Sequence, residues 1–94
     1  MNKYELLFII SVDQTEEQRE AIIAKLKKFI EDRSGVIAGI DKWGVRKLAY
    51  PIKFKNEGYY VLMNFEAQPQ LIKEMEHAMN LMESIVRKMF TVKE

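Results

Sequence analysis

The chain has 94 residues, of which 15 are lysine or arginine and 14 are aspartate or glutamate, so its formal net charge is only +1. This length indicates a single domain over residues 1–94, with a core large enough to fold without covalent staples. The sequence has 0 cysteines, which excludes disulfides and thiolate metal sites. Its apolar runs are far shorter than the roughly 18 residues of a membrane span, so we expect a soluble, cytoplasmic protein without membrane contact.

The first predicted element is a strand over residues 3–10, in which side chains alternate between the two faces of a sheet. Leu6, Phe8 and Ile10 share one face, which we expect to be buried. Leu7 and Ile9 share the opposite face and are also apolar. This strand therefore predicts a sheet with apolar residues on both faces.

A helix follows, and its start is marked by the capping box Thr15-Glu16-Glu17-Gln18. The threonine hydroxyl can accept from an early helical N–H, and the glutamine side chain can reach back to the threonine N–H. Ser34-Gly35 is expected to end the helix. Apolar residues at helical spacing predict its buried side: Ile22, Leu26, Phe29 and Ile30.

Residues 36–52 are predicted to be extended, with a bulge or bend near Gly44. Pro51 has no N–H to donate to a neighbouring strand, so we expect this strand to lie at a sheet edge. Residues 55–58 are predicted to form a turn, and residues 59–66 the next strand.

Gln68-Pro69 is expected to begin a second helix, because proline is favoured at the first helical position. Its predicted buried side consists of Leu71, Met75, Ala78, Met79 and Met82. Residues 85–92 form the last predicted strand. The order β-α-β-β-α-β predicts an α+β ferredoxin-like sandwich, a four-stranded antiparallel sheet in the order 4-1-3-2 with two helices on one face.

Two helices cover only one face of such a sheet, yet the other face is also rich in apolar side chains. Leu7, Ile9, Tyr60 and Leu62 are predicted to gather there. A contiguous apolar patch is unusual on a lone soluble domain. Either a loop or terminus folds over it, or a protein partner or a second copy covers it.

The sequence offers no catalytic constellation. His77 is the only histidine, has no partner at motif spacing and is expected to be a solvated helical residue. The segment after the first strand has neither glycine nor cation, which argues against a phosphatase-like enzyme. We expect no catalytic residues, no metal site, no cofactor and no small-molecule substrate.

An RNA-recognition motif shares this fold and stacks bases on aromatic residues of its open sheet face. Its third strand requires a cation, a glycine, an aromatic, a small residue and a second aromatic. The segment Glu57-Gly58-Tyr59-Tyr60-Val61 matches only the glycine and the first aromatic. Base stacking on this face is therefore not expected.

Cations gather in the middle of the chain. Between Lys42 and Lys55 there are five lysines or arginines and no acid, and Arg46 and Lys47 are adjacent. Arg87 and Lys88 form a second pair. Surface lysines also serve solubility alone, but a basic segment of this kind favours contact with a polyanion.

Four segments together resemble one known family over essentially the whole chain. Lys3-Tyr4-Glu5, the run Gly44-Val45-Arg46-Lys47-Leu48-Ala49-Tyr50-Pro51-Ile52, Gly58-Tyr59-Tyr60 and Ile85-Val86-Arg87 are similar to the bacterial small-subunit ribosomal protein six family. The resemblance implies a ferredoxin-like fold and no enzymatic activity. It also implies a place in the platform of the small subunit, bound to 16S ribosomal RNA together with ribosomal protein eighteen as a heterodimer.

Two sets of residues follow as candidates. Charge and position indicate an RNA-binding set of Lys3, Arg46, Lys47, Lys53, Lys55, Arg87 and Lys88. The apolar face indicates a protein-partner set of Leu7, Ile9, Leu48, Tyr50, Tyr60 and Leu62. The alternative is a homo-oligomeric ferredoxin-like interaction module, in which the open sheet faces of two copies pair.

Overall fold

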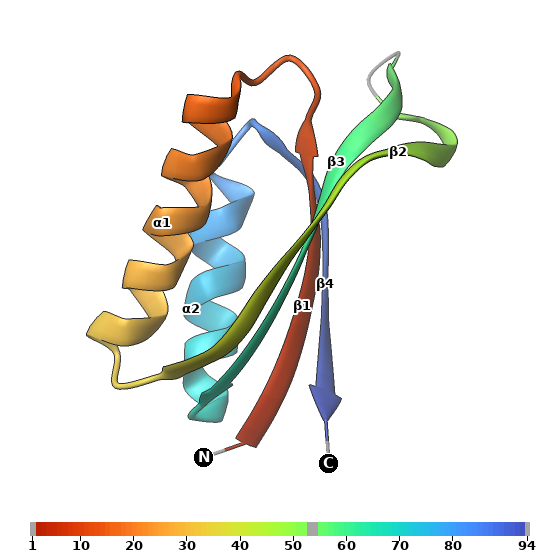
Figure 1. The fold of residues 1–94 in the computed structure, drawn as a ribbon. Helices are drawn as coiled ribbons and strands as arrows, with labels where there is room; N and C mark the ends of the chain where they lie inside the picture. The colour runs from red at the N-terminus through yellow and green to blue at the C-terminus, as the bar shows by residue number, and fades with distance from the viewer. Residues whose placement is uncertain (1, 53–54, 94) are drawn as a thin grey trace.

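The computed structural model describes residues 2–52 and 55–93 (Figure 1). The elements in chain order are β1 (Asn2–Ser11), α1 (Glu16–Asp32), β2 (Val36–Ile52), β3 (Lys55–Ala67), α2 (Pro69–Asn80) and β4 (Ile85–Lys93). Lys53 of the predicted RNA-binding set lies outside the described residues. No helix of the described part of the chain is long and apolar enough to cross a membrane.

The four strands form one antiparallel sheet in the order β2-β3-β1-β4, with β2 at an edge as Pro51 predicts. Both helices lie on the same side of this sheet, and we call its other side the open face (Figure 1). The ferredoxin-like prediction is confirmed. The long β2–β3 hairpin bends away from the helices at its far end, so that it curls toward the open face.

The core lies between the sheet and the helices. Leu6, Phe8 and Ile10 of β1 are fully buried there, as are Val61 and Met63 of β3. The prediction of which alternate residues of these strands face the helices is therefore correct. The helices add Ile23, Leu26 and Ile30 from α1 and Leu71, Met75 and Met79 from α2.

The capping box at the start of α1 is confirmed. The Thr15 hydroxyl accepts from the Gln18 N–H at 3.1 Å, and the Gln18 side-chain oxygen accepts from the Thr15 N–H at 2.8 Å. At the other end, the Gly35 N–H donates to the Ile30 carbonyl at 2.8 Å and the Ser34 N–H to the Glu31 carbonyl at 3.1 Å. These two bonds form a Schellman motif, with Ser34 in the left-handed conformation at φ 65°.

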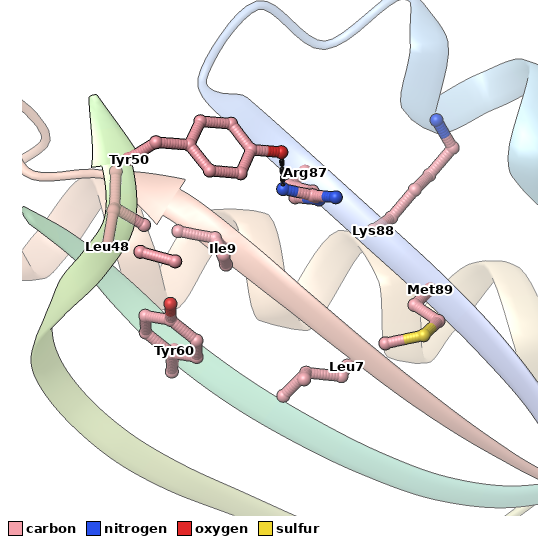
Figure 2. Close-up of a pocket in the computed structure, with 9 residues that line it drawn as sticks. Leu7, Ile9, Leu48, Tyr50, Tyr60, Arg87, Lys88 and Met89 are labelled. Carbon is pink, nitrogen blue, oxygen red and sulfur yellow. Dashed lines mark hydrogen bonds between the residues drawn. The ribbon is translucent and has the colours of Figure 1, made fainter. Parts of the chain in front are cut away.

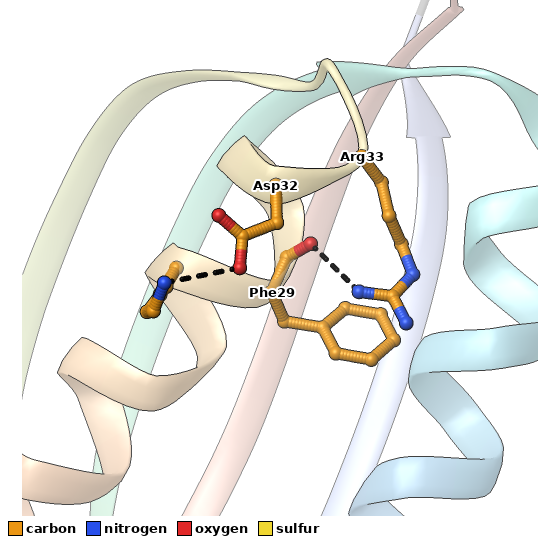
Figure 3. A network of polar contacts seen from close by, with 4 residues as sticks. Phe29, Asp32 and Arg33 are labelled. Atoms are coloured by element: carbon orange, nitrogen blue, oxygen red, sulfur yellow. Dashed lines mark hydrogen bonds and ion pairs between the residues drawn. The ribbon is translucent and has the colours of Figure 1, made fainter.

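Arg33 ties the end of α1 to α2. Its guanidinium lies 3.6 Å from the centre of the Phe29 ring and donates to the Phe29 carbonyl (Figure 3). It also pairs with Glu74 of α2 at 2.7 Å. In the same turn Lys28 pairs with Asp32 at 3.2 Å. Ion pairs within the chain thus occupy the helix layer near the end of α1.

Three sequence predictions need correction. Residues 55–58 were predicted as a turn but belong to β3, because β2 and β3 keep pairing beyond the body of the sheet, as in Arg46 opposite Gly58. Ile23, absent from the predicted buried side of α1, is buried, whereas Ile22 and Phe29 are only partly so. Met82 lies beyond the end of α2 rather than within it.

Candidate protein and nucleic-acid interface

An apolar pocket lies on the open face, under the curled end of the hairpin. Its cavity volume is about 200 Å³. Figure 2 shows side chains from all four strands around it. The lining consists of Leu7, Ile9, Leu48, Ala49, Tyr50, Tyr60, Arg87, Lys88 and Met89. Five of the six residues predicted to meet a protein partner therefore come together here, and Leu62 lies beside them, opposite Leu7.

Gly58 allows the hairpin to close over this pocket. A side chain at this position would place its Cβ 2.2 Å from Ile9 Cγ2 and 3.5 Å from Leu48 Cδ2. With no side chain there, Leu48 and Ile9 approach each other across Gly58. As a result Ile9 is only 6% exposed although it faces away from the helices.

The apolar face is therefore partly covered by its own chain and partly open. Ile9 is covered by the hairpin, as in the alternative in which a loop of the chain folds over the apolar face. Met89 of β4, at the other side of the pocket, is 58% exposed. The remaining apolar surface is available for a partner of this chain.

Arg87 and Tyr50 join β4 to β2 across the mouth of the pocket. The Arg87 guanidinium donates to the Tyr50 hydroxyl and lies 5.3 Å from the centre of the Tyr50 ring (Figure 2). Both residues are exposed. The sequence assigned Arg87 to RNA and Tyr50 to a protein partner, but the two side chains are in contact, so the candidate sets are not spatially separate.

The predicted cations fall into different environments. Arg46 lies on the open face opposite Gly58, and its neighbour Lys47 lies opposite Glu57. Lys55 pairs with Asp13 at 3.0 Å. Lys88 lies opposite Phe8 on the helix side and donates to the side-chain oxygen of Asn80. Of the predicted RNA-binding set, Arg87 and Lys88 line the pocket, and Arg46 lies on the open face outside that lining.

Lys3 is separated from these cations. It lies opposite Glu66 and Lys93 at the other end of the sheet. Along β1 it is six residues from Ile9, a distance of about 20 Å at the rise of an antiparallel strand. It lines a hollow of about 500 Å³ that also contains Asn64, Glu66 and Lys93, so its surroundings carry both signs of charge.

Lys42 belongs to the basic middle segment but points toward the helices. Its ammonium pairs with Glu20 of α1, and this hydrogen bond raises the pKa of Lys42 above its usual 10.5. Because the folded-state pKa is raised, the contribution of the charged form to stability is present at neutral pH and is lost only as the pH rises through the alkaline range. Lys42 therefore supports the fold rather than the open face.

Trp43 is a surface residue that the sequence interpretation missed. Its ring stacks on Tyr60 with centroids 6.3 Å apart and planes 7° from parallel, and the residue is 43% exposed. The available signal was the single tryptophan of the chain next to Gly44, where a bulge was already predicted. The bulge is confirmed, with Gly44 at φ 83°.

The described residues contain no group of three or more histidine, aspartate or glutamate side chains placed to hold a metal ion. His77 is exposed on α2, as predicted for a solvated helical histidine. The chemistry of this surface consists of apolar contact, aromatic rings and guanidinium groups, which suits binding.

Comparisons with known proteins give a consistent answer. Residues 3–92 match the family described as ribosomal protein S6. The chain is 44% identical over 87 residues to the small ribosomal subunit protein bS6 of Caldanaerobacter subterraneus subsp. tengcongensis, covering 93% of this chain and 92% of that protein. It is 40% identical over 94 residues to the protein of the same name from Clostridium botulinum strain 657, covering 100% of both.

Solved structures agree with the sequence comparisons. The crystal structure of 30S ribosomal protein S6 from Thermotoga maritima superposes with a TM-score of 0.92 at 35% identity, covering 98% of this chain and 87% of that chain. The C-terminal domain of the MgtC protein from Mycobacterium tuberculosis superposes with a TM-score of 0.67 at 9% identity, over 100% of this chain and 89% of that one. The second likeness concerns the fold alone.

Proposed function

This chain belongs to the ribosomal protein S6 family, and from that premise we propose that it is a structural constituent of the small ribosomal subunit that binds 16S ribosomal RNA together with ribosomal protein eighteen. The observation that carries this proposal is the open face, which holds an apolar pocket with the exposed Arg87 at its mouth and a second exposed arginine, Arg46. A surface of this composition suits joint contact with a protein and a polyanion. The proposed role involves no enzymatic step.

The protein-partner part of the proposal rests on the pocket. Its apolar wall is supplied by Leu7, Ile9, Leu48 and Tyr60, and Met89 extends it toward β4. Burial of apolar surface contributes roughly 25 cal/mol per Å² before the costs of association are subtracted. We propose that ribosomal protein eighteen covers this surface, and that Tyr50 and Leu62 lie within the contact.

The RNA part rests on Arg46 and Arg87. Guanidinium groups bind phosphates with two parallel hydrogen bonds, and such contacts position a protein without reading sequence. Lys3, Lys47, Lys53, Lys55 and Lys88 are proposed as further phosphate contacts. Lys55 and Lys88 would have to exchange their partners Asp13 and Asn80 for phosphate oxygens.

The experiment compares RNA affinity with and without the partner. With a net charge of +1, the chain alone should bind the central-domain RNA fragment weakly, and the heterodimer should bind it much more tightly. Filter binding or anisotropy at several salt concentrations measures both affinities. Equal RNA affinity in the presence and absence of ribosomal protein eighteen would contradict the proposal.

The homo-oligomeric interaction module remains the second candidate, because exposed apolar residues such as Met89 and Trp43 lie on the open face. In that case two open faces would pair. Sedimentation of the pure protein over a range of concentrations separates the two functions. A chain that stays monomeric until the partner is added rules out the module.

A further inference from the structure

Trp43 lies in a β-bulge of β2. Lys42 lies opposite Val61 and Gly44 opposite Tyr60, which are consecutive residues of β3, so Trp43 is the extra residue of a bulge. Gly44 accommodates the bulge with a φ of 83°, which favours glycine. Bulges of this kind change the direction of a side chain. Here Lys42 faces α1, whereas the next residue, Trp43, lies on Tyr60 of the open face.

The indole ring is supported from the sheet side. It is nearly parallel to the Tyr60 ring, with a 7° angle and 6.3 Å between centroids. Tyr60 is itself half-buried in the pocket wall, which limits its movement. Trp43 is 43% exposed, so part of its ring is open to solvent while Tyr60 supports it from the sheet.

A cation adjoins this surface. Arg46 is exposed, and its Nε donates to the Trp43 carbonyl oxygen at 3.3 Å, which keeps the guanidinium next to the indole-bearing residue. Lys47, the next residue, points to the other face of the strand and lies opposite Glu57. Asp41, the acid of β2 on the same face as Arg46, lies further along the strand opposite Leu62. An aromatic platform beside a cation is the combination that binds single-stranded RNA, since the base stacks and its phosphate is neutralised.

We propose that Trp43 stacks one unpaired RNA base and that Arg46 binds the phosphate next to it. This inference rests on the proposed RNA-binding function and assigns it a specific contact. It departs from the sequence expectation that no base stacks on the open face. That expectation was based on the aromatic pattern of the third strand. The stacking residue proposed here, Trp43, comes from β2, and Tyr60 of β3 only packs beneath it.

RNA is favoured over a protein side chain by the charge around the ring. The residues that line the apolar pocket, the surface suited to a protein, do not include Trp43, whereas Arg46 of the same face donates to the Trp43 carbonyl. A protein contact at Trp43 is the competing outcome, and the experiment below detects it directly.

Because the chain has one tryptophan, fluorotryptophan incorporation gives a single fluorine NMR signal from position 43. The labelled chain is titrated with short single-stranded oligouridine and oligoadenosine, with an RNA duplex of equal length, and with ribosomal protein eighteen alone. We expect the signal to shift with the single strands, both for the free chain and with the partner bound, and to stay in place with the duplex. Equal shifts with single-stranded and duplex RNA, or a partner-bound chain whose signal no longer responds to the single strands, overturns the proposal.

Two variants separate stacking from apolar contact. In the heterodimer, Trp43→Leu should weaken binding of the central-domain RNA fragment by about five- to 150-fold, the range measured for loss of one base–aromatic stack, whereas Trp43→Phe should keep most of the affinity. Leu81→Ala, at a residue 74% exposed after α2, is the matched control and should change nothing. Urea denaturation of each variant checks that the fold is intact.

The results distinguish this inference from the proposed function. If the heterodimer binds the fragment equally well with leucine at position 43, the function stands and the stacking site is wrong. If the heterodimer does not bind the fragment at all, the function is wrong, and the oligonucleotide titration still decides whether Trp43 stacks on a base.

Discussion

Single residues control how the open face is built, and Gly58 is the clearest case. It is buried, and it lies where β3 passes closest to Ile9 of β1. The missing Cβ lets Leu48 cover Ile9 and so forms one wall of the pocket. Gly39, another glycine of the β2–β3 hairpin, has nothing within 4 Å of where its Cβ would be.

We predict that Gly58→Ala destabilises the protein by about 1–3 kcal/mol, because an added methyl group in close packing forces its neighbours apart. Gly39→Ala is the matched control and should stay within about 0.5 kcal/mol of the parent. The free energy of unfolding in urea measures both. Equal effects at the two positions would mean that the contact with Ile9 is not tight.

A second prediction at the residue scale concerns charge. Arg46→Ala should lower the salt slope of RNA binding by the heterodimer by about 0.7 to 0.9, the value for one phosphate contact. Lys28→Ala removes the same charge from the helix layer, where Lys28 pairs with Asp32. It should leave the slope unchanged. A similar decrease for both variants would indicate that only net charge matters.

Among the elements, α1 shows how local sequence fixes both ends of a helix. The capping box satisfies N–H groups at the start, and the Schellman motif satisfies carbonyl groups at the end. The two ends differ in strain. Ser34, rather than a glycine, adopts the left-handed conformation, which is unfavourable for a residue with a Cβ.

We expect Thr15→Ala to cost about 1 kcal/mol of stability, the usual value for an N-cap. Ser34→Gly should instead stabilise by about 0.5–1 kcal/mol, because relief of the left-handed strain exceeds the added entropy of the unfolded chain. Thermal unfolding, with opposite shifts in Tm, measures both. A lower Tm for Ser34→Gly would show that the hydroxyl contributes more than the strain costs.

The elements also show what a sequence can and cannot predict. Thr15, Pro51 and Gly44 act through local chemistry, so the helix start, the edge strand and the bulge were predictable. The length of the β2–β3 hairpin was not, because Lys55 to Gly58 have turn-like composition and become a strand only by pairing with β2. The burial of Ile9 depends on Leu48, far away in sequence, and the ion pair of Lys55 with Asp13 joins the start of β3 to the segment between β1 and α1. Such long-range contacts leave no periodic signal.

In the whole molecule, the two sides of the sheet have different roles. The helices cover the core on one side, whereas the open face carries the pocket, the arginines and Trp43. This division allows the partner surface to be altered without disturbing the core. Met89 is suited to such a test because it is 58% exposed and still borders the pocket.

We predict that Met89→Glu weakens binding of ribosomal protein eighteen at least about tenfold, because it places an unpaired charge within an apolar contact. The chain itself should keep its stability. Leu81→Glu, at a more exposed apolar residue next to α2, is the control and should bind the partner normally. Calorimetric titration measures the affinities, and normal binding by Met89→Glu would place the contact elsewhere.

The sheet order also has a consequence for how this chain emerges during its synthesis. β1 is made first, yet it lies in the interior of the sheet, between β3 and β4. After β3 has emerged and paired, the other edge of β1 stays bare until Ile85–Lys93 follows. A bare apolar edge can pair with other chains. The nascent protein is therefore most prone to aggregation in the interval between the emergence of its third and fourth strands, and the addition of β4 ends that vulnerability.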